Sequence, residues 1–368
     1  MSITPILQFG TSRFLQAHAD LFISDALARA EAPGPITVVQ SSGDAGRAGR
    51  LAAMAEGYDV RLRGVQDGVQ VDETVPVTSV VRGLSLATDM EAVRRILTDE
   101  ARIILSNTAD VGFRPQPADS GASYDPAMSF PAKLAHLLRP RYEDGIAPPQ
   151  VMPTELVQNN GAVLRGLVLD AAAGMDSAYR DWLADGVTWV NSLVDRIVSE
   201  PLDPAGAVAE PYALWAIEHQ PGLTLPCTHP AVQVVADLNV IERRKLFVLN
   251  LGHSWMVSEW LMQGRRGATL VRDVMADPER AAQLRELYVE EVLPGFRAAG
   301  EDAGLEEYIS VTLERFANPF LDHRLEDIAQ NHDEKLQRRI AAFVNWARRN
   351  GDTGAKPRLE RALKGEDR

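Results

Sequence analysis

The chain has 368 residues, 45% of them hydrophobic and 24% charged, and a formal net charge of −13. This composition is typical of a globular protein, and the length favours two domains. The acidic balance argues against a general nucleic-acid or anionic-membrane surface, although a pocket can still be basic. Cys227 is the only cysteine, which excludes an internal disulfide and a cysteine-rich zinc site. With no recognisable signal peptide and no bilayer-length apolar run, we expect a metal-independent cytoplasmic protein.

The first predicted elements are a buried strand over residues 3–9 and a helix that follows a turn at Gly10. Backbone N–H groups at the start of such a helix can bind a pyrophosphate. Ser12 stands where a second glycine would allow closest approach, and Phe14 follows soon after. A dinucleotide-binding loop and an ordinary turn between strand and helix therefore both fit this segment.

Residues 35–40 form a second predicted strand, rich in β-branched residues. Dinucleotide-binding folds often place an acidic residue at the end of this strand, where it binds the adenine ribose. Here that position is Gln40, and Arg47 and Arg50 follow it. The arginines could meet a 2′-phosphate or could be solvated helix charges, so the choice between NAD and NADP stays open.

Residues 58–82 alternate between polar and apolar types and contain Asp67-Gly68, a strong signal for a hairpin turn. We expect an antiparallel excursion from the main sheet over this range. A helix is predicted next, over residues 90–98.

A buried strand that begins at residue 101 ends in the polar residues Asn107 and Thr108. Ligands collect at the C-terminal ends of strands in open α/β sheets. The two residues are therefore candidate contacts on the nicotinamide side, and a polar cap on the strand is the alternative.

Residues 187–198 are strand-like and hold Asn191 between apolar neighbours. A buried asparagine must satisfy its amide, either on the backbone or on a ligand oxygen. Residues 201–208, rich in proline and glycine, are the most linker-like stretch of the chain.

Beyond this stretch the pattern becomes helical, and the charged tail 351–368 is expected to fray. The predicted fold class is α/β, with a Rossmann-like domain over residues 1–205 that carries the antiparallel excursion. A mostly α-helical domain follows over residues 206–368. Its helices are expected over residues 209–218, 241–263, 267–275, 277–298, 303–317, 320–330 and 332–349.

One apolar helical run carries Lys245, Asn250 and His253. At about 100° per residue, Asn250 lies roughly 140° and His253 roughly 80° round from Lys245, so one broad face holds all three. A lysine in an apolar setting can act as a base near neutral pH, and a neighbouring amide and imidazole can hold an oxygen. The alternative is a buried helix with a snorkelling lysine and a hydrogen-bonded core histidine.

Several motifs in this order resemble the mannitol dehydrogenase family, the polyol-specific long-chain dehydrogenases and reductases. The resemblance runs from about residue 6 to about residue 340, and it is nearest to the tagaturonate and fructuronate reductases of that family. Its motifs are Lys245…Asn250…His253, Asn191-Ser-Leu-Val-Asp-Arg-Ile, Arg315-Phe-Ala-Asn-Pro with His323 and Lys335 beyond it, and Gly10…Phe14-Leu-Gln-Ala-His.

The resemblance implies a metal-independent dehydrogenase in which Lys245 is the general acid/base. Asn191 and Asn250 would donate hydrogen bonds to the oxygen where charge develops, and His253 would orient the substrate hydroxyls. It also implies NAD as cofactor, with NADP not excluded. The implied substrate contacts are Lys335, His323 and Arg315. The implied cofactor contacts are Gly10, Thr11, Ser12, Phe14, Gln40, Asn107 and Thr108.

The substrate implied by the resemblance is a small sugar acid or polyol, oxidised at a secondary alcohol in an altronate/tagaturonate-like reaction. The chain departs from the family at Ser12 and Gln16, where glycine and arginine are usual, and the helical domain is shorter than usual at its C-terminus. Asp327 stands where mannitol-type members have an arginine. The alternatives are a mannitol or arabinitol 2-dehydrogenase and a catalytically silent nucleotide-binding protein. A monomer or small homo-oligomer is expected.

Overall fold

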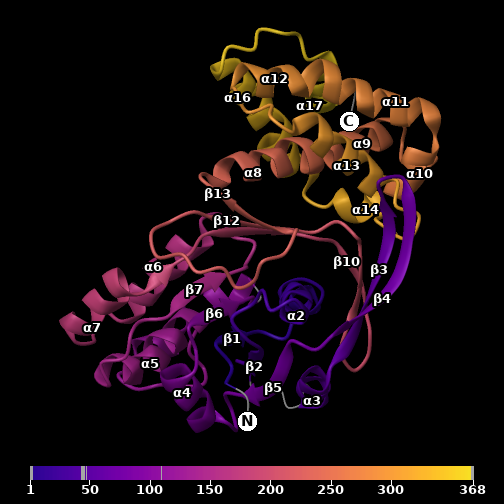
Figure 1. Ribbon diagram of the computed structural model, residues 1–368. Coiled ribbons are helices and arrows are strands. Elements are labelled where there is room, and N and C mark those ends of the chain that lie inside the picture. The colour runs from indigo at the N-terminus through magenta and orange to yellow at the C-terminus, as the bar shows by residue number, and fades with distance from the viewer. Residues whose placement is uncertain (1–2, 43–45, 47, 109, 366–368) are drawn as a thin grey trace. The chain divides into compact units, whose positions relative to one another are not determined.

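The computed structural model describes residues 3–42, 46, 48–108 and 110–365. Its internal contacts divide the chain into two compact units, each with its own hydrophobic core (Figure 1). Unit 1 comprises Met1–Leu62, Glu73–Ala209 and Ala213–Leu238. Unit 2 comprises Arg63–Asp72, Glu210–Tyr212 and Asn239–Arg368.

Unit 1 is built on a six-stranded sheet whose described pairings are all parallel. The spatial order is β5-β2-β1-β6-β7-β8, which is 3-2-1-4-5-6 when the strands of this sheet are numbered along the chain. That is the order of the doubly wound dinucleotide-binding fold, and it confirms the predicted Rossmann-like domain. The strands are β1 Ile6–Phe9, β2 Ile36–Gln40, β5 Val80–Ser85, β6 Ile103–Ser106, β7 Gln150–Pro153 and β8 Thr188–Trp189.

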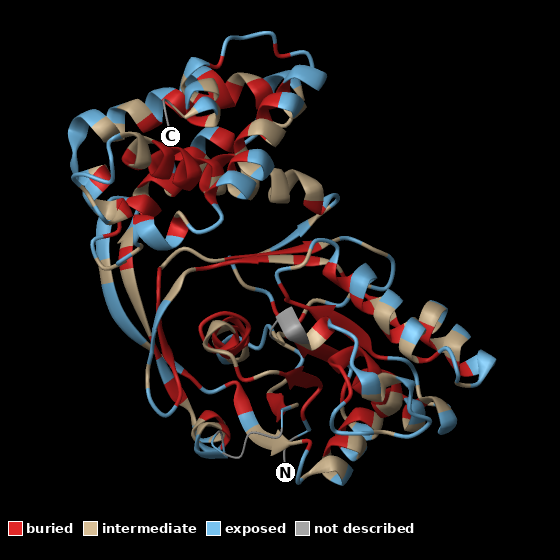
Figure 2. Cartoon of the chain, turned by 180° about the vertical axis from the view of Figure 1, so that it is seen from behind, coloured by how far each residue is buried: buried red, intermediate tan, exposed pale blue. Residues whose placement is uncertain are grey.

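Helices cover both faces of this sheet. Successive strand residues point to opposite faces, so each strand contributes side chains to both cores. Ile6 joins the core formed with α2 and α3, whereas Leu7 joins the core formed with α4, α5 and α6. Strands β1, β2, β6 and β7 are buried on both faces (Figure 2). Such strands consist largely of apolar residues, so they could be predicted from the sequence. The helices are α1 Arg13–Gln16, α2 Ala19–Ala28, α3 Ala48–Glu56, α4 Met90–Asp99, α5 Phe130–Glu143, α6 Asn160–Ala171 and α7 Ser177–Asp181, the last followed by the π turn Trp182–Gly186. Short 3₁₀ turns lie at Asp110–Phe113 and Pro117–Ser120.

The expected hairpin is present as β3 Tyr58–Gln66 and β4 Val69–Val77. Its turn residues have φ of 54° at Asp67 and 74° at Gly68, the left-handed backbone that a two-residue hairpin turn needs. The hairpin belongs to a four-stranded sheet of order β10-β11-β3-β4, with β10 Val198–Pro201 and β11 Ala207–Ala209.

The predicted excursion extended too far, because residues 80–82 belong to β5 of the parallel sheet. Val80 is buried and pairs with Ile36, so this segment returns to the main core instead of continuing the hairpin. Alternation alone did not reveal the change of sheet, since β5 keeps the same mixed pattern of burial.

The prediction of a helix over residues 209–218 is wrong. Residues Leu214–Glu218 form β12, the middle strand of a third sheet with β9 Ser192–Asp195 and β13 Val232–Val235. Trp215 and Ile217 are fully buried in the core of unit 1. A short apolar run suits either a helix or a strand, and tertiary packing decided it. Residues 213–238 therefore group with unit 1, beyond the expected boundary at residue 205.

Unit 2 is a helical bundle around an aromatic core that includes Phe247, Phe296 and Phe343, and it confirms the mostly α-helical second part. Three long helices contain wide π turns, at Lys245–Asn250, Tyr288–Val292 and Leu336–Ala341. The α-helices are α8 Leu238–Arg244, α9 Leu251–Met262, α10 Val271–Ala276, α11 Pro278–Leu287, α12 Leu293–Ala298, α13 Leu305–Phe316, α14 Leu325–Ile328, α15 His332–Lys335, α16 Ala342–Arg349 and α17 Pro357–Lys364.

The described part of the tail expected to fray is instead anchored through α17 Pro357–Lys364, and residues 366–368 lie outside the described residues. The buried Glu291 carboxylate accepts hydrogen bonds from the backbone N–H of Arg358 (2.9 Å) and of Leu359 (3.0 Å), which caps this helix. Lys356 is also buried and donates to Asp352 and to the Glu291 carbonyl, both at 2.6 Å. The charged composition of the tail concealed these contacts, because Glu291, which contacts both Lys356 and Arg358, is distant in sequence.

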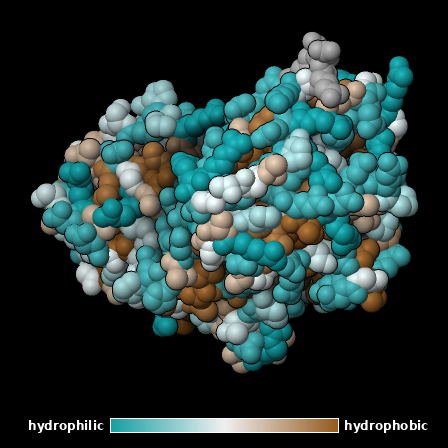
Figure 3. All heavy atoms as spheres, turned by 90° about the horizontal axis from the view of Figure 1, so that it is seen from above, coloured by the Kyte–Doolittle hydropathy of each residue, from teal (hydrophilic) through white to brown (hydrophobic). Residues whose placement is uncertain are grey.

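The face shown in Figure 3 is mostly hydrophilic, with apolar residues in groups between hydrophilic ones. In the part of the chain that the structure describes, no helix combines the length and apolar character needed to cross a membrane.

Candidate cofactor and catalytic sites

A cavity of about 640 Å³ in unit 1 opens where β1, β2 and β6 end. The order of strands reverses between β1 and β6, and ligands of open α/β sheets bind outside the strand ends at such a point. The side chain of Phe14 does not line this cofactor cavity and instead stacks on His18, with ring centroids 4.8 Å apart. The other predicted cofactor contacts all line it: Gly10, Thr11, Ser12, Gln40, Asn107 and Thr108.

Gly10 is held against the end of β6. Its φ of +119° lies in the region that favours glycine, and a Cβ there would lie 2.5 Å from the Asn107 carbonyl oxygen. Ser12 donates to Asn107 Oδ1 at 2.9 Å and accepts from the N–H of Leu15 at 3.2 Å. The residue that departs from the family glycine therefore caps α1 and joins the loop to β6.

Asn107 and Thr108 are fixed by β7 and the loop after it. The Asn107 amide donates to Thr154 O at 3.0 Å, and both the N–H and the hydroxyl of Thr108 donate to Glu155 Oε1. Burial raises the pKa of Glu155, and hydrogen bonds from Thr108 and Ser106 oppose that rise. These bonds account for the polar strand end, while both residues still border the cofactor cavity.

Two basic residues border the same cavity, Lys133 from α5 and Arg50 from α3. Lys133 is 8% exposed and donates to Ser41 O at 3.1 Å, and burial lowers its pKa. Sequence reasoning missed Lys133, although a lysine inside the apolar helix start Phe130–Leu134 was a usable signal. Arg47, the other candidate for a 2′-phosphate, lies outside the described residues. A cavity with two cations in an acidic protein suits an anionic nucleotide.

Gln16, which replaces the usual arginine, is fully buried. Its amide donates to Thr11 O at 3.1 Å, and its carbonyl accepts from the N–H of Gly206 at 2.6 Å. The residue thus connects the turn after β1 to the strand pair β10–β11 and adds no charge of its own there.

Asn191 lies between β8 and β9, and its amide orientation is fixed on both sides. Oδ1 accepts from the N–H of Ala162 at 3.0 Å, and Nδ2 donates to Glu218 Oε2 at 2.8 Å. One N–H of the amide therefore remains for another acceptor. An amide held in this way can donate that N–H to a ligand oxygen.

The fully buried Asn160 holds the backbone beside Asn191, and sequence reasoning missed it. Its amide donates to the carbonyls of Pro153, Glu155 and Ser192, and its oxygen accepts from the N–H of Ser192 at 2.9 Å. The signal available in the sequence was the Asn-Asn-Gly turn at residues 159–161.

Lys245, Asn250 and His253 lie on one continuous helix of unit 2, named here the lysine helix (residues 238–262). The expected geometry was that of an α-helix, but Lys245–Asn250 is a π turn with hydrogen bonds between residues i and i+5. Each residue of a π turn rotates less than in an α-helix, so Lys245 and Asn250 come closer to one face than the sequence suggested. The three residues therefore face more nearly the same side of the lysine helix than they would in an α-helix. Asn191 belongs to unit 1.

A tyrosine stabilises the π turn. The Tyr288 hydroxyl donates to Val248 O at 2.9 Å, and Tyr288 is fully buried. Gly252 lies directly beneath that hydroxyl, where any Cβ would collide with it. The glycine between Asn250 and His253 is therefore required by packing.

His253 is 7% exposed, and its ring contacts Phe316 (4.5 Å between centroids) and His323 (4.6 Å). Burial lowers the pKa of His253 well below its ordinary value, and the charges of His323 and then Arg339 lower it further. Its Nε2 is buried and has no hydrogen-bond partner in the described protein. A neutral imidazole with an unused nitrogen can hold a substrate hydroxyl.

The predicted substrate contacts differ in their surroundings. Arg315 is buried in a bidentate pair with Glu210, at 3.0 and 2.7 Å, and its guanidinium lies 4.1 Å from the Tyr212 ring centroid. This pairing gives Arg315 a structural role that accounts for its burial. Lys335 is half-buried and donates to Ile328 O at 2.7 Å, and His323 contacts His253.

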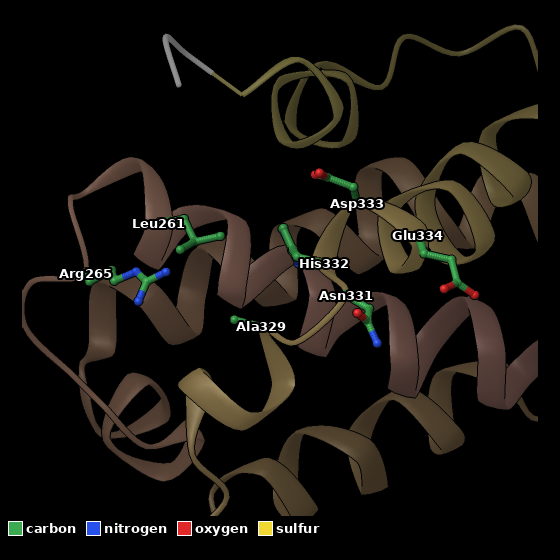
Figure 4. A pocket seen from close by; sticks show the side chains of 7 residues that line it. All are labelled: Leu261, Arg265, Ala329, Asn331, His332, Asp333 and Glu334. Carbon is green, nitrogen blue, oxygen red and sulfur yellow. The ribbon is translucent and has the colours of Figure 1, made fainter.

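A second cavity, of about 670 Å³, opens beside the end of the lysine helix (Figure 4). It is lined by none of the predicted site residues. Its lining is Leu261, Arg265, Ala329, Asn331, His332, Asp333 and Glu334. Among the residues that the structure describes, no group of three or more histidines, cysteines or carboxylates is placed to hold a metal ion.

Comparisons with known proteins agree with this geometry. Residues 5–224 match the mannitol dehydrogenase Rossmann domain, and residues 237–357 match the mannitol dehydrogenase C-terminal domain. The chain is 32% identical over 372 residues to an altronate oxidoreductase of Bacillus subtilis (strain 168), covering 94% of this chain and 76% of that protein. It is 30% identical over 370 residues to an altronate oxidoreductase of Halalkalibacterium halodurans, covering 92% of this chain and 70% of that protein.

Solved structures show the same fold. A D-sorbitol dehydrogenase in substrate-free form is 22% identical with a TM-score of 0.83, over 99% of this chain and 80% of that one. The Pseudomonas fluorescens mannitol 2-dehydrogenase, solved with NAD and D-mannitol, is 20% identical with a TM-score of 0.71. The match covers 99% of this chain and 78% of that one. Both domains of one family are matched in their expected order along the chain. The chain therefore belongs to the mannitol dehydrogenase family.

Proposed function

We propose that this protein is an NAD(P)-dependent oxidoreductase that interconverts the secondary alcohol of a sugar acid or polyol and the corresponding ketone. The cofactor cavity at the switch point of the parallel sheet is the observation that carries the proposal. Relatives named altronate oxidoreductase support a sugar acid of the altronate/tagaturonate type as substrate. Gly10, Ser12, Gln40, Asn107 and Thr108 would hold the nucleotide, with Lys133 and Arg50 as added cations.

When bound, the nicotinamide supplies the hydride acceptor for alcohol oxidation. Lys245 Nζ takes the hydroxyl proton as the C–H hydride leaves the carbinol carbon, and it returns a proton to the ketone oxygen in reduction. Asn191 and Asn250 donate hydrogen bonds to the oxygen on which negative charge develops. His253, neutral because it is buried, orients a neighbouring hydroxyl. No step needs a metal ion.

A substrate screen tests this proposal. Altronate, mannonate, mannitol and arabinitol are offered with NAD⁺ and with NADP⁺, and reduced nicotinamide is followed by its absorbance. We expect turnover of an aldonate. Turnover of neutral polyols alone would support a mannitol or arabinitol 2-dehydrogenase instead. Binding of nucleotide without any turnover would support the silent nucleotide-binding alternative.

Gly10→Ala is expected to weaken nucleotide binding about 10-fold or more, because a side chain there is strained by about 1–3 kcal/mol and also collides with Asn107. NADH titration followed by thermal shift measures the effect. Gly145→Ala is the matched control, since Gly145 also has a positive φ (+68°) but open space around it, away from the cavity. Equal nucleotide affinity in the wild type and Gly10→Ala would remove this loop from the cofactor site.

A further inference from the structure

Two cations of unit 2 lie one helical turn apart beside the lysine helix. Lys335 ends α15, and Arg339 follows in the π turn Leu336–Ala341. Both side chains are half-buried, and within the described ranges neither forms an ion pair with a carboxylate. A ligand that covers these cations removes their remaining solvent, and a buried charge needs a partner. Such a ligand is therefore expected to bring a negative charge.

Arg339 is fixed against the proposed catalytic residues. Its Nη1 donates to the carbonyl of Asn250 at 3.3 Å and to the hydroxyl of Ser254 at 3.1 Å. These two residues flank His253 on the lysine helix. Both bonds use the same nitrogen, which leaves the N–H groups of Nε and Nη2 for a planar acceptor. A carboxylate suits that fork, because it accepts two parallel N–H bonds from one guanidinium.

The electrostatic surroundings are positive around His253. Lys335 and Arg339 both lower the pKa of His253, after the larger effects of burial and of His323. Burial lowers the pKa of Lys335, and the charge of Arg339 lowers it further, so the two cations repel each other without full compensation. Arg315 also faces His253, but Glu210 neutralises it.

The acidic groups nearby do not neutralise the two cations. Glu334 raises the pKa of Lys335, but its carboxylate lies 3.4 Å from Arg338 and lines the second cavity, together with Asp333 (Figure 4). The charge of Asp327 raises the pKa of His323, against the larger lowering effect of burial. Neither Lys335 nor Arg339 lines that cavity. A negative charge placed between the two cations would meet uncompensated partners.

We infer that Lys335 and Arg339 form a carboxylate subsite, in which Arg339 binds the acid end of the substrate and sets the preference for a sugar acid over the neutral polyol. This inference rests on the proposed oxidoreductase function and adds to it a residue that selects the substrate. The terminal carboxylate accepts two N–H bonds from Arg339 and one from Lys335, while the reacting hydroxyl lies nearer the lysine helix.

The test compares an aldonate with the alditol of the same stereochemistry, in which CH₂OH replaces the carboxylate. We expect Arg339→Met to reduce the ratio of kcat/KM for aldonate over alditol about 10- to 100-fold, as the loss of a charge-assisted pair should. Arg339→Lys keeps the charge without the fork and should fall between Arg339→Met and the wild type. Arg338→Gln is the matched control, because Arg338 is the exposed neighbour that pairs with Glu334. It should leave the ratio unchanged.

Binding provides a second measurement that does not depend on turnover. The aldonate alone should raise the melting temperature of the wild type and of Arg338→Gln, and should raise that of Arg339→Met much less. If the wild type turns over the alditol as well as the aldonate, the carboxylate subsite is wrong while the oxidoreductase stands. If no substrate turns over but the aldonate stabilises only proteins with Arg339, the oxidoreductase proposal fails and the anion site remains. An unchanged ratio in a folded Arg339→Met overturns the inference.

Discussion

Replacing Lys245 with methionine is expected to reduce kcat about 10²–10⁴-fold, the usual contribution of a general acid/base. Methionine keeps the length and apolar stem of the side chain within a helix whose neighbours Phe247 and Val248 are buried, so the fold should persist. The proton of the alcohol then has no positioned acceptor, and hydride loss leaves a charged intermediate without its partner. Steady-state rates with the best substrate of the screen measure the change.

Two comparisons make the Lys245 result specific. NADH binding should be unchanged, because the proposed nucleotide contacts line a cavity of unit 1. Lys364→Met removes an exposed lysine of α17 in the same unit and should leave the rate unchanged. A Lys245→Met protein that retains the wild-type rate would mean that the lysine helix serves only as a core helix.

Replacing Lys356 with methionine should lower the free energy of unfolding by about 3–5 kcal/mol, the usual effect of removing one partner from a buried ion pair. Asp352 would remain 8% exposed without its cation, and the Glu291 carbonyl would lose a hydrogen bond. Urea unfolding measures the change. Replacing both residues with apolar ones should recover much of the stability, because the uncompensated charge is then gone.

Arg348→Gln is the control for this pair, since Arg348 contacts Glu360 at 2.9 Å with both side chains largely exposed. Its effect should stay below about 1 kcal/mol.

Burial alone would raise the pKa of Asp352, but hydrogen bonds from Lys356 and from the Gly354 N–H outweigh it and lower that pKa. The stabilisation from this carboxylate is therefore present above its ordinary pKa of 3.8 and is lost as the pH falls below it. Equal stability of Lys356→Met and the wild type would contradict a structural role for the tail.

The parallel sheet could be predicted because its strands are buried on both faces, and the apolar runs at Ile36–Gln40 and Ile103–Ser106 show this directly. The candidate cofactor contacts other than Phe14 could be predicted to lie together at one cavity, since the ends of parallel strands meet at one edge. By contrast, β12 was taken for a helix because its short apolar run, Leu214–Ile217, carries no clear period. Helix α17 was missed because Glu291, which caps it, is 67 residues away along the chain.

The candidate catalytic residues show the same division. The types and spacing of Lys245, Asn250 and His253 were visible in the sequence, but the π turn was not, because it depends on Tyr288 contacting Val248. The donor role of Asn191 was predicted, whereas the partners that orient it, Ala162 and Glu218, are set by tertiary packing. Sequence indicated which groups are candidates for the chemistry, and the contacts that orient them required the structure.

The wide turn at Lys245–Asn250 has a consequence for how this helix can vary in length. An i→i+5 turn accommodates one more residue than an α-turn of the same height. Deleting a single residue there would let the backbone close into a regular α-helix without turning the two flanking segments relative to each other. Lys245 and His253 would then be seven residues apart, about 20° from each other round the helix at about 100° per residue, and would still share one face. The wide turn is therefore what allows a spacing of eight residues to keep Lys245 and His253 on one face.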